Sequence, residues 1–160
     1  SSRIACLRYA ALEWAGRREG GRAVEVVRAC DISQMANSVY AFNHGHKPSV
    51  RSIEHHSATD LDALGADTWL MSPPCQPYTS QGLQQDDQDP RARALLHLIK
   101  VLPEMKHKPS YILLENVKNF EVSKSHGMWV GVLQECGYVM QQLLLTPPQL
   151  GIPNERLRYY

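Results

Sequence analysis

The sequence predicts an α/β domain in which helices cover both faces of a mostly parallel sheet. Short apolar runs of strand length alternate along the chain with segments whose apolar residues recur at helical spacing. Three residues with reactive or charged side chains, Asp31, Cys75 and Glu115, follow three of the predicted strands. Because ligands bind beyond the carboxyl ends of the strands in such sheets, we expect these three side chains to cluster at one edge.

The first third of the chain predicts two helices with a strand between them. Residues 7–14 carry apolar side chains at helical spacing, and a glycine-rich basic loop follows at residues 16–21. Residues 24–30 are rich in apolar side chains and predict a buried strand that ends at Asp31. Residues 33–43 predict a helix with an apolar side made of Met35, Val39 and Phe42.

The middle of the chain predicts short elements around one rigid turn. Residues 50–53 predict a short strand, and residues 61–64 predict part of a helix. Residues 68–71 predict a compact strand that runs directly into Ser72-Pro-Pro-Cys75. Two consecutive prolines stop both a helix and a strand ladder, and they fix the backbone in front of the cysteine. Residues 79–90 are polar and acidic, which predicts a loop.

The last part of the chain continues the alternation. Residues 92–102 predict a helix with an inward-facing apolar side. That side consists of Leu95, Leu98, Ile99 and Leu102. Residues 111–114 predict a buried strand that ends at Glu115. Residues 128–136 predict a helix with Gly137 as its C-cap, and residues 139–145 predict a further strand.

The composition is that of an ordinary soluble globular domain, with 43% hydrophobic and 21% charged residues in a chain of 160. No apolar run reaches the roughly 20 residues that cross a bilayer. Arg3 and Arg8 flank an apolar patch that is too short for a signal peptide. We therefore expect a soluble intracellular protein. The net charge of +1 gives little attraction to nucleic acid, so such a partner has to be inferred from a site.

Neither the cysteines nor the histidines form a metal-binding pattern. Cys6, Cys30 and Cys136 are far apart and belong to no Cys-x-x-Cys pair, which favours buried structural thiols. Four histidines share a polar stretch without any metal-ligand spacing, which favours a solvated connection and predicts no metal site. The four are His44, His46, His55 and His56.

The flanks of Cys75 set it apart from the other cysteines. A nucleophilic thiolate has to be exposed and held in one geometry, and the end of a strand followed by prolines provides both. Glu115 ends another strand, where its carboxyl group can serve as a proton donor or as a hydrogen-bond acceptor to a base. Asp31 suits binding of the ribose hydroxyls of a nucleotide cofactor, with a helix N-cap as the alternative.

Three segments that contain these residues resemble the motifs of the cytosine-5 methyltransferase family. Ser72-Pro-Pro-Cys-Gln-Pro-Tyr-Thr79 resembles its catalytic PPCQPF motif, and Glu115-Asn-Val resembles its ENV motif. Residues 149–159 are similar to its QxxGxPxxRxR segment. The surrounding residues resemble the eukaryotic branch that methylates tRNA-aspartate and was first classed among the DNA methyltransferases. The resemblance runs from about Cys6 to Tyr160.

The resemblance implies a Rossmann-like methyltransferase domain, a reaction, and a role for each matching residue. Cys75 would attack carbon 6 of cytosine, which activates carbon 5 toward the methyl group of S-adenosylmethionine. Glu115 would engage the ring nitrogen and the exocyclic amine. Arg156 and Arg158 would position the base and support Glu115. Substrate contacts are further implied for Gln76 and Asn116.

The resemblance also implies the binding site of S-adenosylmethionine. It assigns the ribose contact to Asp31 and the adenine contacts to Ile53 and Glu54. It assigns further contacts to Ser72 and Pro74. The implied partner is tRNA in the cytoplasm and nucleus. DNA as the substrate stays an alternative.

The chain departs from the family pattern at both ends. Its start resembles the helix that follows the family's first strand and glycine loop, so that loop is expected to be missing. Its end precedes the position of the family's target-recognition region. We therefore expect residues 1–160 to be a partial catalytic domain that binds S-adenosylmethionine weakly or not at all. Two hypotheses stand: a fragment of an active enzyme, or a non-catalytic remnant that binds RNA or a protein partner.

Overall fold

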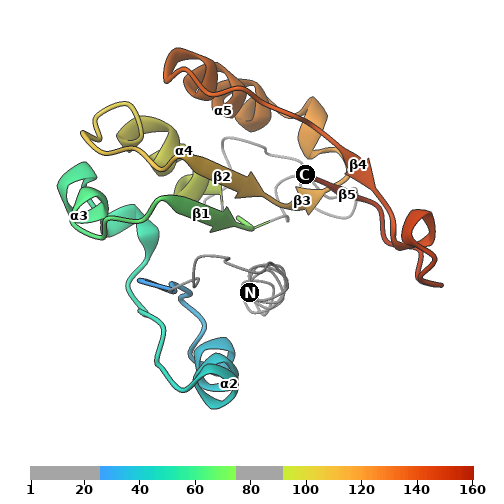
Figure 1. The fold of residues 1–160 in the computed structure, drawn as a ribbon, viewed down its shortest axis with the longest axis horizontal. Coiled ribbons are helices and arrows are strands. Elements are labelled where there is room, and N and C mark those ends of the chain that lie inside the picture. The colour runs from blue at the N-terminus through green and yellow to red at the C-terminus, as the bar shows by residue number, and fades with distance from the viewer. Residues whose placement is uncertain (1–25, 75–91) are drawn as a thin grey trace, which may run out of the picture. The chain divides into compact units, whose positions relative to one another are not determined.

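The computed structural model describes residues 26–74 and 92–160 (Figure 1). The chain divides into two compact units, residues 1–55 and residues 56–160. The predicted helix at 7–14 and the predicted loop at 79–90 lie outside the described residues. No helix among residues 26–74 and 92–160 is long and apolar enough to cross a membrane.

The first unit contains one long helix, α2 (Gln34–His44), as predicted for residues 33–43. The Ser33 side chain caps it by accepting a hydrogen bond from the Ala36 backbone N–H, and Gly45 ends it with a positive φ of 72°. The buried residues of α2 are Asn37 and Tyr40. Its predicted apolar side is instead exposed. The exposed fractions are 81% for Met35, 54% for Val39 and 90% for Phe42.

The strands predicted at 24–30 and 50–53 are wrong in extent. Within the described residues, this region forms a single parallel bridge between Cys30 and Ser49. Residues 50–53 do not form a strand, and the 3-10 helix η1 (Ile53–His55) begins there. The Ser52 hydroxyl accepts a hydrogen bond from the Glu54 backbone at 3.4 Å. Such local side-chain bonds compete with a strand ladder, which explains the turn.

The second unit is built on a pair of parallel strands, β1 (Thr68–Met71) and β2 (Tyr111–Leu114). Both occupy the predicted residues, and their register pairs Met71 with Leu114. The helix α3 (Ala58–Asp62) precedes β1 and begins three residues before the predicted segment, because Ser57 and Asp60 form a capping box. The predicted burial of β2 is wrong for Tyr111 and Leu113, which are exposed, whereas Leu114 is buried.

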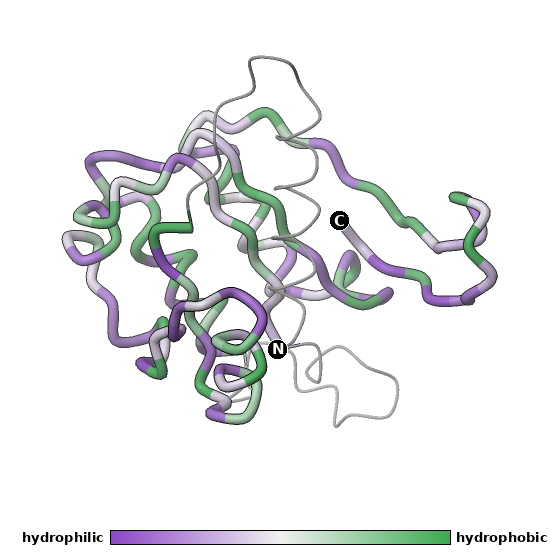
Figure 2. Tube along the Cα trace, turned by 60° about the horizontal axis from the view of Figure 1, so that its bottom comes forward, coloured by the Kyte–Doolittle hydropathy of each residue, from purple (hydrophilic) through white to green (hydrophobic). Residues whose placement is uncertain are grey.

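Two helices of this unit, α4 (Arg93–Val101) and α5 (Lys124–Glu135), contact one another. The predicted inward side of α4 is confirmed for Leu95, Leu98 and Leu102, which are buried, and Ile99 is half-buried. α5 begins four residues before the predicted helix because the Ser123 side chain caps it. The predicted C-cap at Gly137 is wrong by one residue, because Cys136 is the C-cap and Gly137 follows it with a φ of 82°. Figure 2 shows the hydrophobic and hydrophilic stretches that alternate along these elements.

A small antiparallel sheet, which the sequence did not predict, completes the unit. It has the order β3 (Asn116–Val117), β5 (Arg158–Tyr159), β4 (Leu144–Leu145). The strand predicted at 139–145 is therefore much shorter than expected. Two 3-10 helices connect these strands to their neighbours, η5 (Phe120–Val122) after β3 and η6 (Pro147–Leu150) after β4. The α/β class with parallel strand pairing is confirmed, and the antiparallel sheet is an addition to it.

Candidate functional site

Glu115 lies at the carboxyl end of β2, directly before β3. Its backbone N–H donates a hydrogen bond of 2.8 Å to the Met71 carbonyl, which extends the parallel pairing of β1 and β2 by one residue. Only 7% of Glu115 is exposed. A carboxyl group in such a position needs a polar or charged partner.

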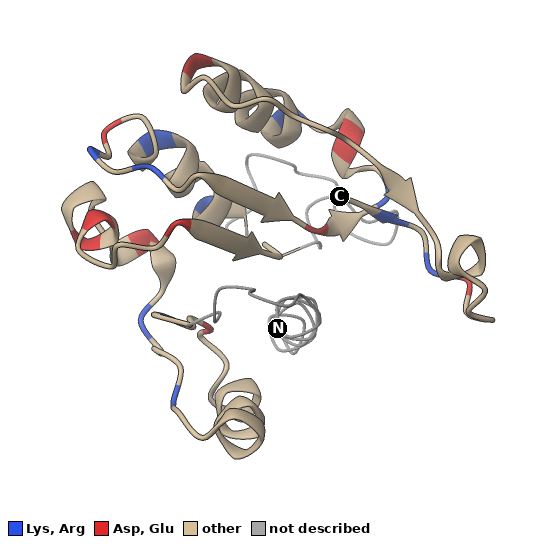
Figure 3. Ribbon diagram, viewed as in Figure 1, with Lys and Arg blue, Asp and Glu red and all other residues tan. Residues whose placement is uncertain are grey.

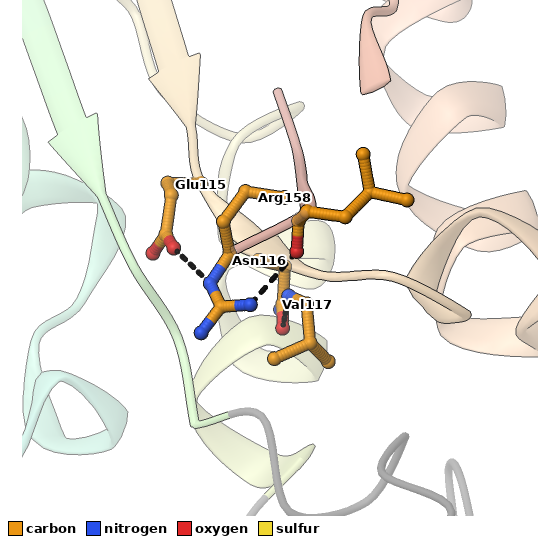
Figure 4. Close-up of polar contacts among 5 residues, drawn as sticks. Glu115, Asn116, Val117 and Arg158 are labelled. Carbon is orange, nitrogen blue, oxygen red and sulfur yellow. Dashed lines mark hydrogen bonds and ion pairs between the residues drawn. The ribbon is translucent and has the colours of Figure 1, made fainter. Parts of the chain in front are cut away.

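Arg158 provides that partner from β5. The Arg158 Nε atom lies 3.1 Å from the Glu115 Oε1 atom, and the two side chains are 16% and 10% exposed (Figure 4). Arg158 Nη1 donates a 2.8 Å hydrogen bond to the Leu157 carbonyl, which fixes the guanidinium plane. The Nε–H itself is not directed into a hydrogen bond, so the contact with Glu115 is an ion pair. The structure thus joins two of the predicted site residues.

The position of Arg158 follows from the register of the antiparallel sheet. Val117 pairs with Arg158, and Asn116 pairs with Tyr159. Neighbouring residues of a strand point to opposite faces, so Arg158 points toward Glu115 and Tyr159 points away from it. The motif at residues 115–117 and the arginine segment therefore meet through backbone pairing.

Arg156, the other predicted arginine, is exposed and lies outside this contact. Its backbone N–H donates a hydrogen bond of 3.4 Å to the Thr146 hydroxyl. Among the described residues, no ion pair or hydrogen bond of its side chain is present. A role for Arg156 toward a bound base stays a prediction.

Asn116 is fully buried beside Glu115. Its Oδ1 atom accepts a 2.8 Å hydrogen bond from the Val117 backbone, and its Nδ2 atom is buried without a hydrogen-bond partner among the described residues. An unpaired buried donor is costly and uncommon in native proteins. The predicted substrate contact of Asn116 stays a prediction. In the structure its buried side chain bonds to the backbone of β3.

The end of β1 leads to the predicted nucleophile. Ser72 is half-buried and Pro74 is exposed, and both follow Met71 directly. Cys75 and Gln76 lie outside the described residues. Because β1 and β2 are paired in parallel, the segment that leads to Cys75 begins at the sheet edge where Glu115 lies.

The remaining cofactor candidates belong to the first unit. Asp31 is not the N-cap of α2, since Ser33 takes that role, so this alternative is wrong. The Asp31 Oδ1 atom accepts a 2.8 Å hydrogen bond from the Ser33 backbone, which leaves Oδ2 as a further acceptor. Ile53 and Glu54 lie half-buried on η1. Asp31 and Glu115 belong to different units, so their expected clustering stays a prediction.

Charge and metal-ligating groups are dispersed over the described elements. Figure 3 shows that the positions of acidic and basic residues are interspersed along the described part of the ribbon. Among residues 26–74 and 92–160, no three histidine, cysteine, aspartate or glutamate side chains are placed to hold a metal ion. His46, from the histidine-rich stretch, contacts the Tyr40 hydroxyl at 3.2 Å instead.

The structure contains a polar cluster that the sequence did not predict, on the face of β5 away from Glu115. His126 Nε2 lies 2.9 Å from Gln142 Oε1 and 3.1 Å from the Tyr159 hydroxyl. Tyr159 donates a hydrogen bond of 3.1 Å to the same Gln142 oxygen. The one sequence feature that could have pointed to this cluster is that Tyr159 directly follows Arg158, a predicted site residue.

Comparison with known proteins finds similarity to one family over most of the chain. Residues 9–160 match the family model described as C-5 cytosine-specific DNA methylase. The chain is 46% identical over 144 residues to the tRNA (cytosine(38)-C(5))-methyltransferase of Mus musculus, covering 89% of this chain and 35% of that protein. It is 40% identical over 148 residues to the DNA (cytosine-5)-methyltransferase of Dictyostelium discoideum, covering 91% of this chain and 39% of that protein.

The fold agrees with a solved structure of the same kind. The crystal structure of S. pombe Dnmt2 methyltransferase aligns with a TM-score of 0.81 at 38% identity, covering 95% of this chain and 44% of that chain. The α/β methyltransferase fold predicted from the sequence is thereby confirmed. This chain spans less than half the length of each of these three proteins.

Proposed function

The chain belongs to the C-5 cytosine-specific DNA methylase family, and we propose that the protein methylates carbon 5 of cytosine in tRNA. One observation carries the proposal. Glu115, from one family motif, forms a 3.1 Å ion pair with Arg158, from another, at the strand end beside the segment that leads to Cys75.

Cys75 acts as the nucleophile in this proposal. Its thiolate forms a bond to carbon 6 of the cytosine, and the electron pair of the 5,6 double bond moves toward carbon 5. Carbon 5 would then bond to the methyl group as the bond of that methyl to the sulfonium sulfur of the donor breaks, which leaves the donor as a neutral thioether. Loss of the carbon 5 proton and expulsion of the thiolate restore the double bond, so the enzyme returns to its starting state.

Glu115 makes the ring susceptible to this attack. One oxygen of its carboxyl group accepts a hydrogen bond from the exocyclic amine, and the other, when protonated, donates to the ring nitrogen, which draws electrons away from carbon 6. Arg158 holds the carboxyl group in place through the ion pair. Arg156, exposed two residues earlier, is available to position the base or a phosphate.

S-adenosylmethionine supplies an electrophilic methyl group when it is bound. Asp31 fits the ribose, because one carboxylate oxygen remains available to accept hydroxyl hydrogen bonds. The family resemblance would assign the adenine contacts to Ile53 and Glu54, and further cofactor contacts to Ser72 and Pro74.

RNA is favoured over DNA as the substrate. The mouse relative is named for methylation of cytosine 38 of tRNA, and the anticodon loop of tRNA-aspartate is the proposed target. A loop cytosine leaves its stack without the few kcal/mol of unpairing that a duplex base requires. The alternative, DNA, is supported by the description of the family model and by the name of the Dictyostelium relative.

The test is methyl transfer by the full-length protein. Purified enzyme and radiolabelled S-adenosylmethionine are incubated with tRNA-aspartate or with duplex DNA. We expect rapid labelling of the tRNA, little labelling of the DNA, and no transfer by Cys75→Ala. Cys136→Ala is the matched control and should retain activity. Preferential labelling of DNA would favour the alternative, and no labelling of either would support the non-catalytic hypothesis.

A further inference from the structure

A cluster of three polar side chains lies against β5 on the face away from Glu115. Its members come from three parts of the chain: His126 from the first turn of α5, Gln142 from the segment before β4, and Tyr159 from β5 itself. The mechanism proposed above uses none of them. Tyr159 is buried, with 6% of its surface exposed, His126 is half-buried and Gln142 is exposed, so the cluster extends from the interior of the unit to its surface.

The hydrogen bonds of the cluster form a closed set. The Gln142 Oε1 atom can only accept, so both His126 Nε2 at 2.9 Å and the Tyr159 hydroxyl at 3.1 Å donate to it. Tyr159 also accepts from His126 Nε2 at 3.1 Å. Burial, and secondarily the charge of Glu121, raise the pKa of Tyr159, so its hydroxyl keeps the proton that it donates.

Aromatic packing makes the cluster rigid. Phe120 is fully buried and meets the His126 ring edge-on, with ring centroids 5.4 Å apart and planes at 86°. The centroids of His126 and Tyr159 are 5.3 Å apart, and their planes lie at 89°. Edge-to-face pairs of this kind add stabilisation beyond the burial of their area.

The antiparallel sheet needs such an anchor. β3, β4 and β5 each contain two residues, so few backbone hydrogen bonds define their register. A slip of one residue moves every side chain of a strand to the other face. Such a slip of β5 would turn Arg158 away from Glu115.

We propose that the His126–Gln142–Tyr159 cluster is a positioning device that sets the register of β5 and thereby holds Arg158 against Glu115. Tyr159 pairs with Asn116, the residue after Glu115, and precedes Tyr160, which exchanges two backbone hydrogen bonds with Leu143. The cluster thus holds the register of β5 through Tyr159 on one face of the strand, while Arg158 contacts Glu115 on the other face. Its catalytic consequence rests on the proposed methyl transfer, whereas its effect on the register does not.

The first measurement is kinetic, on the full-length protein. Tyr159→Phe keeps the ring and removes the hydroxyl. Because a misplacement of about 1 Å can cost about 100-fold in rate, we expect kcat to fall about 10-fold while KM for tRNA stays within about twofold. His126→Leu should behave in the same way, and His126→Gln, whose amide nitrogen can replace Nε2, should restore most of the rate.

Tyr138→Phe is the matched control. Its hydroxyl donates to the Pro109 carbonyl, so this substitution also removes a tyrosine hydrogen bond, but one that does not involve β5. We expect its kcat to stay near the wild-type value. Equal losses of kcat in Tyr138→Phe and Tyr159→Phe would overturn the proposal, because they would indicate general destabilisation.

The second measurement does not need activity. Hydrogen exchange of the Leu143 and Tyr160 amides reports the pairing of β5 directly, because each donates to the carbonyl of the other at 2.9 and 2.8 Å. Tyr159→Phe should accelerate exchange at both amides, and Tyr138→Phe should not. If the wild-type enzyme transfers no methyl group, the proposed function fails, and this exchange alone decides the positioning role. Unchanged exchange in Tyr159→Phe would refute the role.

Discussion

Replacing Arg158 by methionine tests the ion pair with Glu115. Methionine keeps much of the length and apolar volume of the arginine stem, so the change mainly removes the charge. The side chains of Arg158 and Glu115 are only 16% and 10% exposed, and the two charged groups lie 3.1 Å apart. The substitution therefore leaves a nearly buried carboxylate without this partner.

The structure sets the expected magnitude between two limits. Removing one partner of a fully buried ion pair costs about 3–5 kcal/mol, whereas an exposed pair contributes about 0–1 kcal/mol. Arg158 Nε makes no hydrogen bond in this pair, which places it below the buried limit. We expect Arg158→Met to lower the free energy of unfolding by about 2 kcal/mol.

Equilibrium urea unfolding, followed by tryptophan fluorescence, measures this loss. Arg156→Met is the matched control, since the same substitution at an exposed position should change the free energy of unfolding by less than about 0.5 kcal/mol. Combining Arg158→Met with Glu115→Gln should cost less than the sum of the two single changes, because they remove the same interaction. Strictly additive losses would contradict the ion pair.

Three further predictions concern the stability of the second unit. The backbone N–H groups of residues 106–107 hold the pKa of Asp62 below its usual range, so the carboxylate stabilises the fold above the unfolded pKa and this contribution disappears as the pH falls through the folded value. Asp62→Asn should therefore lower the melting temperature at pH 7, and its difference from the wild type should shrink as the pH falls through the lowered folded pKa of Asp62. Phe120→Ala should lower the free energy of unfolding by about 3–5 kcal/mol in urea titrations, because this ring is fully buried. Gly137→Ala should lower the free energy of unfolding by about 1 kcal/mol because the φ of Gly137 is +82°. Gly131→Ala, within α5, should raise the free energy of unfolding by about 0.5–1 kcal/mol. Thermal unfolding compares the two variants, and an equal effect of both would contradict the left-handed end of the helix at Gly137.

The sequence predicted the elements that carry strong apolar patterns. The strands at 68–71 and 111–114 are compact apolar runs bounded by polar residues, and both have the predicted bounds. The helix α5 was predicted to begin at Met128, where its apolar spacing starts. In the structure it begins at Lys124, because the Ser123 side chain caps it there. A side-chain cap lies outside the apolar pattern, so the periodicity alone missed it.

The candidate site was only partly accessible to such patterns. A two-residue strand such as β5 carries no periodicity, so the pairing that brings Arg158 to Glu115 had no signal of its own in the sequence. The family resemblance supplied both residues and implied that Arg158 supports Glu115, and the structure shows which atoms make the contact, Nε and Oε1. The contact of His126 with Tyr159 joins residues 33 positions apart, and only the fold brings them together.

Capture of the covalent intermediate tests the central claim most directly. The full-length protein is incubated with S-adenosylmethionine and tRNA-aspartate that carries 5-fluorocytosine, and protein-linked RNA is isolated under denaturing conditions and mapped by mass spectrometry. Fluorine cannot leave carbon 5 as a proton does, so the thiolate stays bonded to carbon 6 after methyl transfer. We predict one adduct, at Cys75, which is lost in Cys75→Ala and retained in Cys136→Ala. An adduct at another cysteine, or one that forms with duplex DNA and not with tRNA, would contradict this assignment.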